Sequence, residues 1–310
     1  MSSFEEDVLI GLSESPRWLP CKYLYDAKGS ALFEKICDTE DYYVTRADLE
    51  IHRHQIAEVA QLIGSNAHLI EFGSGSGIKT ELLISALLQP RAYTPIEISQ
   101  TALDASVDQL RKRFQHLDVH PLQADYTEDI DPHHLHLDPV ARRRVIYFPG
   151  STIGNFTRDQ ASTFLKRMGK MAGDDGLIFI GVDLIKPINK LLRAYDDSAG
   201  ITAEFNLNLL QRLRNELNAD IDCDAFAHES RFNRALQRVE MHLVAQSPTS
   251  IGLGEQHFEF SKGESIHTES SHKYSIAGFQ DLARESGLNP VRYWLDSQAQ
   301  FSMHCLEPGQ

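Results

Sequence analysis

A short segment in the first third of the chain, residues 67–80, places the tightest constraint on what this chain can fold into. Its sequence, AHLIEFGSGSGIKT, begins as an apolar run, continues through glycines at positions 73, 75 and 77, and leads into the helix-like stretch ELLISALL. Glycine permits positive φ angles and lets a ligand approach the backbone closely. An apolar strand that runs into such a turn before a helix is typical of a parallel α/β sheet that binds a nucleotide-like ligand at the turn.

The spacing of these glycines narrows the choice of ligand. A dinucleotide-binding turn has glycine at its first, third and sixth positions, but the sixth position counted from Gly73 is Ile78. The pattern GxGxG is the form found in S-adenosylmethionine-dependent methyltransferases, and it argues against a nicotinamide-dependent oxidoreductase. On this motif alone, a glycine-rich turn without a ligand remains an alternative.

Acidic residues at two later strand ends favour a nucleotide site. Glu97 lies near the end of the strand-like segment RAYTPIEIS, 20 residues after Gly77. An acid at about this distance accepts hydrogen bonds from ribose hydroxyls in nucleotide-binding βαβ units. Asp125 and Tyr126 end a third segment, HPLQADYTED, where an acid can bind the adenine amino group and an aromatic ring can stack on the base. Each feature alone could be a solvated strand end or a turn, but their order along the chain favours the nucleotide interpretation.

Size and charge limit the classes of partner. The chain has 310 residues, of which 42% are hydrophobic, enough for one large or two modest domains. Its net charge of −14 argues against a nucleic-acid partner, because proteins that bind phosphate backbones usually carry a basic excess. A small cationic or zwitterionic substrate suits an acidic protein better.

Cysteine and histidine spacing does not indicate a metal site. The cysteines at positions 21, 37, 223 and 305 form no CxxC pair, and we predict no bound metal. The histidine-rich stretch DPHHLHLD at 131–138 permits a metal site, although a solvated surface loop is the favoured interpretation. The N-terminus lacks the pattern of a signal peptide, and no apolar run reaches the roughly 18 residues that span a bilayer. We therefore expect a cytoplasmic, monomeric protein without a membrane partner.

Strand and helix patterns alternate over 61–185, which predicts a doubly wound parallel sheet. Residues 187–235 have the pattern of amphipathic helices, RVEMHLVAQ that of a strand, and HFEFSKGESIHTES that of a hairpin. A last hairpin, RYWLDSQAQFSMHCL, would close the sheet in antiparallel sense. We expect an α/β protein with a doubly wound, seven-stranded, Rossmann-like methyltransferase sheet and a second, smaller α+β substrate-recognition domain. The expected boundaries are 61–190 plus 274–310 for the methyltransferase domain and 1–60 plus 191–273 for the recognition domain.

Four polar clusters outside the glycine turn could carry substrate chemistry. The strand end FPGSTIGNF offers the amide of Asn155, and HTESSHKYS places Glu269 and Ser271 on one side of an extended segment. The other two clusters are RAYDDSAGITAEFNLN and the N-terminal pair KYLYDAKGSALFEKI and DYYVTR. A capping residue, a polar hairpin rim, an exposed helix face and core tyrosines are the corresponding structural alternatives.

Taken in order, these segments resemble the histidine-specific Nα-methyltransferases of ergothioneine biosynthesis. The matching motifs are YLYDAKGSALFEKI, EDYYVTR, EFGSGSGIKT, PGSTIGNF, AYDDSAGITAEFNLN and TESSHKYS, and the resemblance extends from about residue 16 to the end. Members of this family methylate L-histidine three times on its amino nitrogen and so produce hercynine. The resemblance implies an S-adenosylmethionine-dependent N-methyltransferase whose partner is the small molecule L-histidine.

The resemblance also implies roles for individual residues. The positions matching the methyl-donor site are Tyr25, Gly73, Ser74, Gly75, Lys79, Glu97, Asp125 and Tyr126. Asn155 and Tyr195 match positions for the histidine carboxylate, Tyr42 matches one near the amino group, and Thr202, Glu269 and Ser271 match positions for the imidazole. Tyr25, Tyr42 and Asn155 are implied to act in catalysis. Two departures are Glu97, where many members have aspartate, and Val44, where many have proline.

Two alternatives remain open within this resemblance. Relatives in the family methylate a tryptophan derivative, and the Glu269 and Ser271 pair argues against that substrate because an indole offers a donor but no ring acceptor. A protein that binds the donor without catalysis is disfavoured by the intact glycine turn and Asn155.

Overall fold

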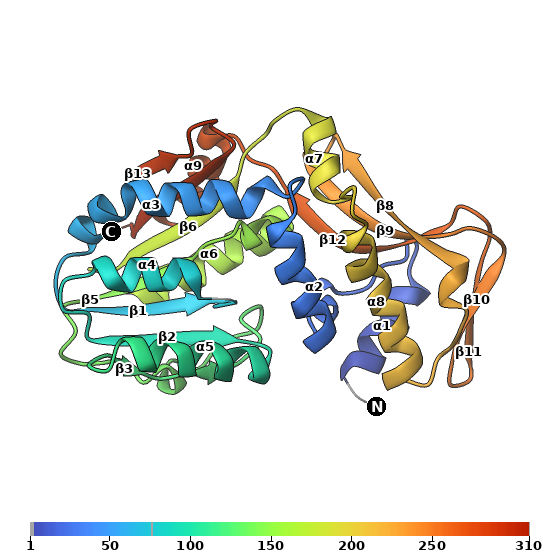
Figure 1. Ribbon diagram of the computed structural model, residues 1–310, viewed down its shortest axis with the longest axis horizontal. Coiled ribbons are helices and arrows are strands. Elements are labelled where there is room, and N and C mark those ends of the chain that lie inside the picture. Colours follow the sequence, from blue (N-terminus) through green and yellow to red (C-terminus); the bar gives the residue numbers. More distant parts are fainter. Residues whose placement is uncertain (1–2, 76, 310) are drawn as a thin grey trace. The chain divides into compact units, whose positions relative to one another are not determined.

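The computed structural model describes residues 3–75 and 77–309 and divides them into two compact units (Figure 1). The mixed unit consists of the described part of Met1–Tyr43 together with Lys186–His272. The sheet unit consists of Val44–Ile185 and Lys273–Gln310, again in its described part.

The sheet unit is built on a sheet that has eight strands among the described residues. Their order is β13-β14-β6-β5-β1-β2-β3, and β4 also pairs with β2. The pairs from β6 through β4 are parallel, whereas β14 pairs with β6 and β13 in antiparallel sense. This order confirms the doubly wound α/β fold and its closing hairpin. The strands are β1 (Ala67–Phe72), β2 (Ala92–Glu97), β3 (Asp118–Val119), β4 (Leu122–Gln123), β5 (Arg143–Phe148), β6 (Leu177–Asp183), β13 (Leu288–Leu295) and β14 (Phe301–Pro308).

An interruption beside β2 accounts for the eighth strand, where seven were predicted. Both β3 and β4 pair with β2, and His120 and Pro121 separate them. Proline has no backbone N–H to donate to a ladder, so the pairing stops there and resumes one residue later.

Helices cover both faces of this sheet. On one face, Phe72 and Phe148 pack against Phe164 of α6, with ring centroids 5.3 and 5.1 Å apart. On the other face, Glu71 bonds to Thr80 of α4, and Tyr147 bonds to a histidine of α3. Side chains alternate along a strand, so each strand must suit two covered faces, which explains the apolar runs. The helices of this unit are α3 (Tyr43–Ile63), α4 (Ile78–Ala86), α5 (Gln100–Arg113), α6 (Arg158–Ala172) and α9 (Ile276–Glu285), together with the short turns η2 (Pro132–Leu135) and η3 (Thr152–Asn155).

Helix α3 groups with the sheet unit apart from its first residue, whereas residues 1–60 were expected in the recognition domain. Asp48 accepts a hydrogen bond from the Gly150 N–H, and His52 bonds to Tyr147, so the buried side of α3 is tied to β5 and the loop after it. These contacts shift the compact unit's boundary to Val44. The assignment of separate catalytic and recognition domains remains a prediction.

The mixed unit contains two small sheets, ordered β11-β10-β7 and β12-β9-β8, within its described residues. Helices α2 and α8 are joined by a 2.8 Å hydrogen bond from Asn208 Nδ2 to Asp26 Oδ1. The elements are α1 (Ser3–Ser13), η1 (Cys21–Leu24), α2 (Ala27–Asp38), α7 (Ile188–Ala194), α8 (Ile201–Glu216), β7 (Asp220–Ile221), η4 (Cys223–Ala225), β8 (Phe226–Asn233), β9 (Arg238–Ala245), β10 (Thr249–Leu253), β11 (Gln256–Phe260) and β12 (Ser265–His272).

Two local expectations in the mixed unit are wrong. The helical pattern does not continue to residue 235, because β8 is a strand whose alternate residues His228 and Ser230 bond to backbone carbonyls of the α7 region. The expected hairpin over 257–270 is also absent from the described chain: β11 pairs with β10, and β12 pairs with β9. Strand β12 is largely buried, and its pairing follows that burial rather than the nearby turn.

Candidate active site

The carboxyl ends of three adjacent parallel strands bring the donor-site candidates to one edge of the sheet. The Gly73 N–H donates to the Ile96 carbonyl over 2.8 Å, joining the end of β1 to β2. The Ala124 N–H donates to the Glu97 carbonyl over 3.1 Å, joining β2 to the segment after β4. Gly73, Glu97 and Asp125 therefore lie along the same edge, where α/β sheets bind their ligands.

The glycine turn has the conformation expected for close approach of a ligand. Gly73, Gly75 and Gly77 have φ angles of 69°, 47° and 71°, all in the left-handed region that favours glycine. A Cβ at Gly73 would lie 3.7 Å from Tyr126 Cε1, whereas one at Gly75 would meet no described atom within 4 Å. Gly77 is the N-cap residue of α4, and its N–H donates to the Ser74 carbonyl over 3.0 Å, so a backbone hydrogen bond closes the turn at the start of the helix.

The polar atoms at this edge fit a nucleoside ligand. Ser74 is 6% exposed, and its hydroxyl has no hydrogen-bond partner within the described chain. Glu97 Oε1 accepts from the N–H groups of Ile98 and Ser99, and no described residue donates to its Oε2, which suits a ribose hydroxyl. Asp125 Oδ1 accepts from the Thr127 N–H over 2.9 Å, which fixes this carboxylate at the strand end.

Tyr126 packs beside this edge as part of an aromatic cluster. Its ring centroid lies 5.9 Å from that of Phe72 and 5.7 Å from that of Phe148. The ring is therefore held beside Gly73, where a flat base could stack on it.

Lys79 is held by a buried acid that sequence reasoning missed. Its Nζ lies 2.8 Å from Asp48 Oδ2, and the same oxygen accepts from the Gly150 N–H over 2.9 Å. A Cβ at Gly150 would lie 3.3 Å from Lys79 Nζ, so the absence of a side chain there leaves room for the amine. Asp48 thus ties the start of α4 to the loop after β5. A charged residue on the buried face of an amphipathic helix was the available signal.

Asp48 remains ionised despite complete burial. Burial alone would raise its pKa, but Lys79 and His52 hold the pKa of this carboxyl well below its usual range. His52 also bonds to the Tyr147 hydroxyl, so a continuous polar chain runs from Lys79 to the middle of β5.

A second buried acid lies under the glycine turn. Glu71 accepts hydrogen bonds from Thr80 Oγ1 and from the Tyr93 hydroxyl. Burial raises the pKa of Glu71 to about 7, although these two hydrogen bonds oppose the shift. This acid can therefore change protonation state near neutral pH directly beneath the donor edge.

Asn155 ends η3, the short turn that follows β5. Ser151, with a φ of 66°, starts this turn, and its hydroxyl accepts from the Asp183 N–H over 2.8 Å. This bond joins the loop to the end of β6. Asn155 is half-buried and belongs to the loop that follows the carboxyl end of β5, the neighbour of β1.

Five of the substrate candidates are gathered within the mixed unit. The Tyr195 hydroxyl donates to Ser271 Oγ over 2.7 Å, and the Tyr25 hydroxyl lies 3.4 Å from Glu269 Oε1. The rings of Tyr42 and Tyr195 are 6.1 Å apart. Tyr25, predicted as a donor-site and catalytic residue, is thus in contact with a predicted imidazole ligand; its role toward the donor remains a prediction.

Thr202 has a buried hydroxyl that suits a ligand. The residue is 2% exposed, and its Oγ1 has no hydrogen-bond partner among the residues that the structure describes. Its backbone N–H donates to Asp197 Oδ1 over 2.7 Å, which fixes the start of α8.

A β-bulge sets the direction of the Glu269 side chain. His267 pairs with His242 and Glu269 with the adjacent Met241 of β9, so Thr268 is an extra residue in β12. Thr268 and Glu269 then both bond to residues of the helical side, through Asn206 and Tyr25 respectively. A bulge redirects a side chain in this way, and its position was not visible in the alternation of HTESSHKYS.

The predicted residues thus fall into two sets. Asn155 and the donor candidates other than Tyr25 belong to the sheet unit. The residues of the mixed unit are Tyr25, Tyr42, Tyr195, Thr202, Glu269 and Ser271. We call the residues of the mixed unit the tyrosine set, and those of the sheet unit other than Asn155 the donor set.

The sheet order and the glycine turn define an α/β methyltransferase. Residues 4–308 match the family described as histidine-specific methyltransferase, SAM-dependent, and the chain belongs to that family. It is 36% identical to the histidine N-alpha-methyltransferase of Mycobacterium tuberculosis, covering 97% of this chain and 94% of the relative. It is 33% identical to the protein of the same name from Mycolicibacterium smegmatis, with the same coverage of each chain. With Ergothioneine biosynthesis protein 1 of Neurospora crassa it shares 31% identity over 94% of this chain and 33% of the relative.

Solved methyltransferase structures are more distant. The CcbJ methyltransferase from Streptomyces caelestis has a TM-score of 0.47 and 12% identity, covering 84% of this chain and 96% of that chain. The fold assignment rests on the strand order itself.

The described residues contain neither a helix that could span a membrane nor a side-chain cluster suited to a metal ion. No helix within 3–75 and 77–309 is long and apolar enough to span a bilayer. In the same part of the chain, no three His, Cys, Asp or Glu side chains are grouped so that they could bind a metal ion, and this covers the histidines of 131–138.

Proposed function

We propose that this protein transfers methyl groups from S-adenosylmethionine to the α-amino nitrogen of L-histidine, giving Nα,Nα,Nα-trimethylhistidine (hercynine) for ergothioneine biosynthesis. Family membership and the relatives named histidine N-alpha-methyltransferase support the reaction. The observation that carries the choice of substrate is the pair of Glu269 and Ser271 on β12, each in contact with a tyrosine hydroxyl.

The donor set would hold S-adenosylmethionine, which supplies a methyl group activated on a sulfonium. Glu97 Oε2 would accept from the ribose, Asp125 would accept from the adenine amino group, and Tyr126 would contact the base. Ser74 and Lys79 would bind the polar end of the ligand, with Asp48 holding the lysine amine in place. These assignments follow the position of the glycine turn and the strand ends, together with the buried Ser74 hydroxyl, which has no partner among the described residues.

The tyrosine set would recognise the amino acid. The Glu269 carboxylate would accept from one imidazole N–H and so select one tautomer, and the hydroxyls of Ser271 and Thr202 would contact the ring. Tyr195 and Asn155 would bind the carboxylate, and Tyr42 would lie near the amino group. An indole could donate to the Glu269 carboxylate but could not accept from a hydroxyl, because it has a ring donor and no ring acceptor.

The reaction requires a neutral amine aligned with the methyl carbon. An α-amino group has a pKa of about 8, so most of it is protonated at neutral pH. Placing the nitrogen in line with the methyl group would supply most of the rate enhancement. The product is a quaternary ammonium, which the faces of the closely grouped rings, including Tyr42 and Tyr195, would tolerate.

The proposal extends to the oligomeric state, cellular location and partners of the protein. We propose a monomeric, cytoplasmic enzyme without a metal ion and without a nucleic-acid or membrane partner. The net charge of −14 supports the exclusion of nucleic acid. Size-exclusion chromatography with light scattering would give the oligomeric state.

Mass spectrometry of reaction products tests the function. Purified protein is incubated with S-adenosylmethionine and a panel of free amino acids that includes L-histidine and L-tryptophan. We expect a product heavier than histidine by three methyl groups. Conversion of tryptophan, or of another amine in place of histidine, would show that the substrate assignment is wrong, while the assignment of S-adenosylmethionine as methyl donor would stand. No conversion of any amine, with donor binding intact, would favour a non-catalytic protein.

A further inference from the structure

Tyr195 is linked to β12 by two hydrogen-bonded routes that together form a ring. On the first route, its hydroxyl donates to Ser271 Oγ over 2.7 Å. On the second route, its backbone carbonyl accepts from His228 Nε2 over 2.8 Å, and His228 Nδ1 lies 2.9 Å from Asn206 Nδ2. Asn206 Oδ1 then accepts from Thr268 Oγ1 over 2.7 Å. The ring links the end of α7, β8, α8 and β12, and it includes Tyr195 and Ser271 of the tyrosine set.

Backbone carbonyls fix the direction of every bond on the second route. The Tyr195 carbonyl can only accept, so His228 Nε2 carries a proton. Asn206 Nδ2 also donates to the His242 carbonyl over 3.1 Å, and turning this amide over would place its oxygen against that carbonyl. His228 Nδ1 therefore accepts from Asn206, and the imidazole is neutral with its proton on Nε2.

The His228 contact satisfies a backbone group that the helix leaves free. Tyr195 follows the last residue of α7, where carbonyl groups lack an intrahelical partner. The His228 side chain is only 1% exposed, so neither group can turn to water instead. Asp196 lies 4.0 Å from Nε2, and with Asp197 and Glu229 it favours the charged imidazole, but burial is the larger influence and lowers the pKa of His228.

We propose that His228 is a positioning residue for the amino-acid site, which holds the Tyr195 backbone so that the Tyr195 hydroxyl and Ser271 keep one arrangement. The inference rests on the proposed function, because it treats Tyr195 and Ser271 as substrate contacts. His228 itself acts through Tyr195.

Two substitutions at His228 separate the two halves of its role. Glutamine can place an N–H near the position of Nε2 and keep the bond to the Tyr195 carbonyl. Asparagine can place an oxygen near Nδ1 and keep the bond to Asn206, but it is too short to reach Tyr195. We expect His228→Asn to raise the KM for L-histidine about tenfold and His228→Gln to change it less than about threefold, with the KM for S-adenosylmethionine unchanged in both.

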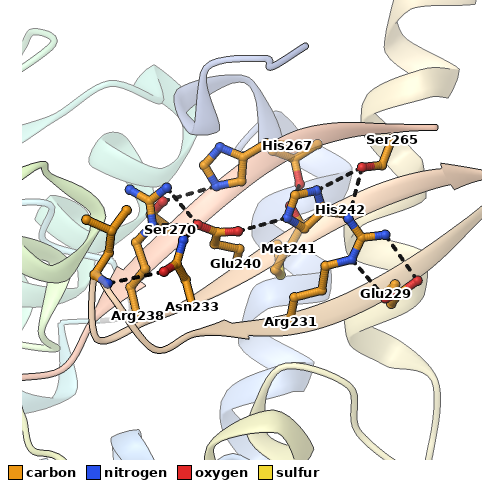
Figure 2. Close-up of polar contacts among 12 residues, drawn as sticks. Glu229, Arg231, Asn233, Arg238, Glu240, Met241, His242, Ser265, His267 and Ser270 are labelled. Atoms are coloured by element: carbon orange, nitrogen blue, oxygen red, sulfur yellow. Dashed lines mark hydrogen bonds and ion pairs between the residues drawn. The ribbon is translucent and has the colours of Figure 1, made fainter. Parts of the chain in front are cut away.

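The neighbouring strand offers a matched control. His242 of β9 bonds through its side chain to Glu240 and Ser265, in a polar network that does not include Tyr195 (Figure 2). We expect His242→Asn to lower the melting temperature without changing the KM for L-histidine. Equal KM values for His228→Asn and His228→Gln, or equal effects of His228→Asn and His242→Asn on KM, would overturn the positioning role.

A measurement without substrate keeps the two proposals distinguishable. Hydrogen exchange of peptides covering 188–201 reports how firmly the end of α7 is held. Faster exchange in His228→Asn than in His228→Gln is expected even if the wild-type protein proves to methylate another amine. Equal exchange in the two variants would overturn the role of His228, whatever the product analysis shows.

Discussion

The donor set and the tyrosine set differ in how far apart their residues lie in the sequence. The donor set combines left-handed glycines with side chains at a helix start and at the ends of three neighbouring strands, all within residues 67–126. The tyrosine set combines residues that directly follow η1 and α7 or precede α3 with residues of α8 and β12, which are far apart in the sequence. A site built from one short stretch depends on local conformation, whereas a site built from distant segments depends on how several elements pack. The first suits a ligand shared by a whole class of enzymes, and the second suits the substrate that differs between relatives.

Disrupting the Asp48 and Lys79 pair should give the largest effect, and it should be confined to the donor side. Removing one partner of a buried ion pair costs about 3–5 kcal/mol, and we expect Asp48→Asn to lie at the lower end because Lys79 is partly exposed. Urea unfolding would measure the loss of stability, and calorimetric titration would show weaker binding of S-adenosylmethionine. The double variant with Lys79→Met should lose less than the sum of the single variants. Additive losses would show that the pair does not act as a unit.

The buried Glu71 should make the sheet unit's stability depend on pH. Its folded pKa of about 7 exceeds the unfolded value of 4.5, so the folded state favours the neutral acid. The stability that the neutral Glu71 contributes to the folded state is fully present below about pH 4.5 and is lost as the pH rises through 7. This lowers the free energy of unfolding by about 3 kcal/mol. We expect Glu71→Gln to be more stable relative to the wild type at pH 8 than at pH 5, measured by urea unfolding. The same difference at both pH values would contradict the shifted pKa.

Alanine substitutions at Glu269 and Glu97 should have opposite effects on two measured quantities, the KM for L-histidine and the affinity for S-adenosylmethionine. Leaving an imidazole nitrogen unpaired costs about 1–3 kcal/mol, so Glu269→Ala should raise the KM for L-histidine about ten- to a hundredfold with donor affinity nearly unchanged. Glu97→Ala should weaken donor binding and leave the KM for L-histidine, measured at saturating donor, close to the wild-type value. If Glu269→Ala keeps normal histidine kinetics, the imidazole assignment is wrong. If Glu97→Ala keeps donor affinity, Glu97 does not bind the ribose.

The Tyr195 and Ser271 bond should have the smallest effect. A neutral hydrogen bond contributes about 0.5–1.5 kcal/mol, so Ser271→Ala should raise the KM for L-histidine roughly two- to tenfold. Ser271→Thr retains a hydroxyl and serves as the matched control, with a smaller change expected. Steady-state kinetics at saturating donor would measure both. An effect of Ser271→Ala as large as that of Glu269→Ala would show that the hydroxyl contributes as much to histidine recognition as the carboxylate does, contrary to this ranking.

Much of the donor edge could be predicted because its causes are local. The apolar strands, the glycine spacing and the acids at positions 97 and 125 each depend on a few adjacent residues, and the sheet order places them together. Asp48 is not among the predicted site residues because its partners, Lys79 and Gly150, are 31 and 102 residues away. No local pattern indicates a pairing of that separation.

The contacts within the tyrosine set could not be predicted from the sequence, for a different reason. Its residues were selected through a resemblance to a family, and nothing in their local sequence predicts the contacts between Tyr25 and Glu269 or between Tyr195 and Ser271. The strand β8 was mistaken for a helix, so the position of His228 could not be foreseen. Strand β12 likewise pairs with β9 and not with β11, its neighbour along the chain, so its partner follows burial rather than the nearby turn.

The sequence by itself determined the parallel sheet, the glycine turn and the acids at the strand ends, because alternation, glycine conformation and strand direction are properties of short segments. Tertiary structure alone decided which buried acid holds Lys79 in place and where the bulge at Thr268 directs Glu269. It also decided that His228 supports Tyr195. These arrangements arise where buried polar groups from distant segments must satisfy one another, and that requirement exists only after the chain has packed.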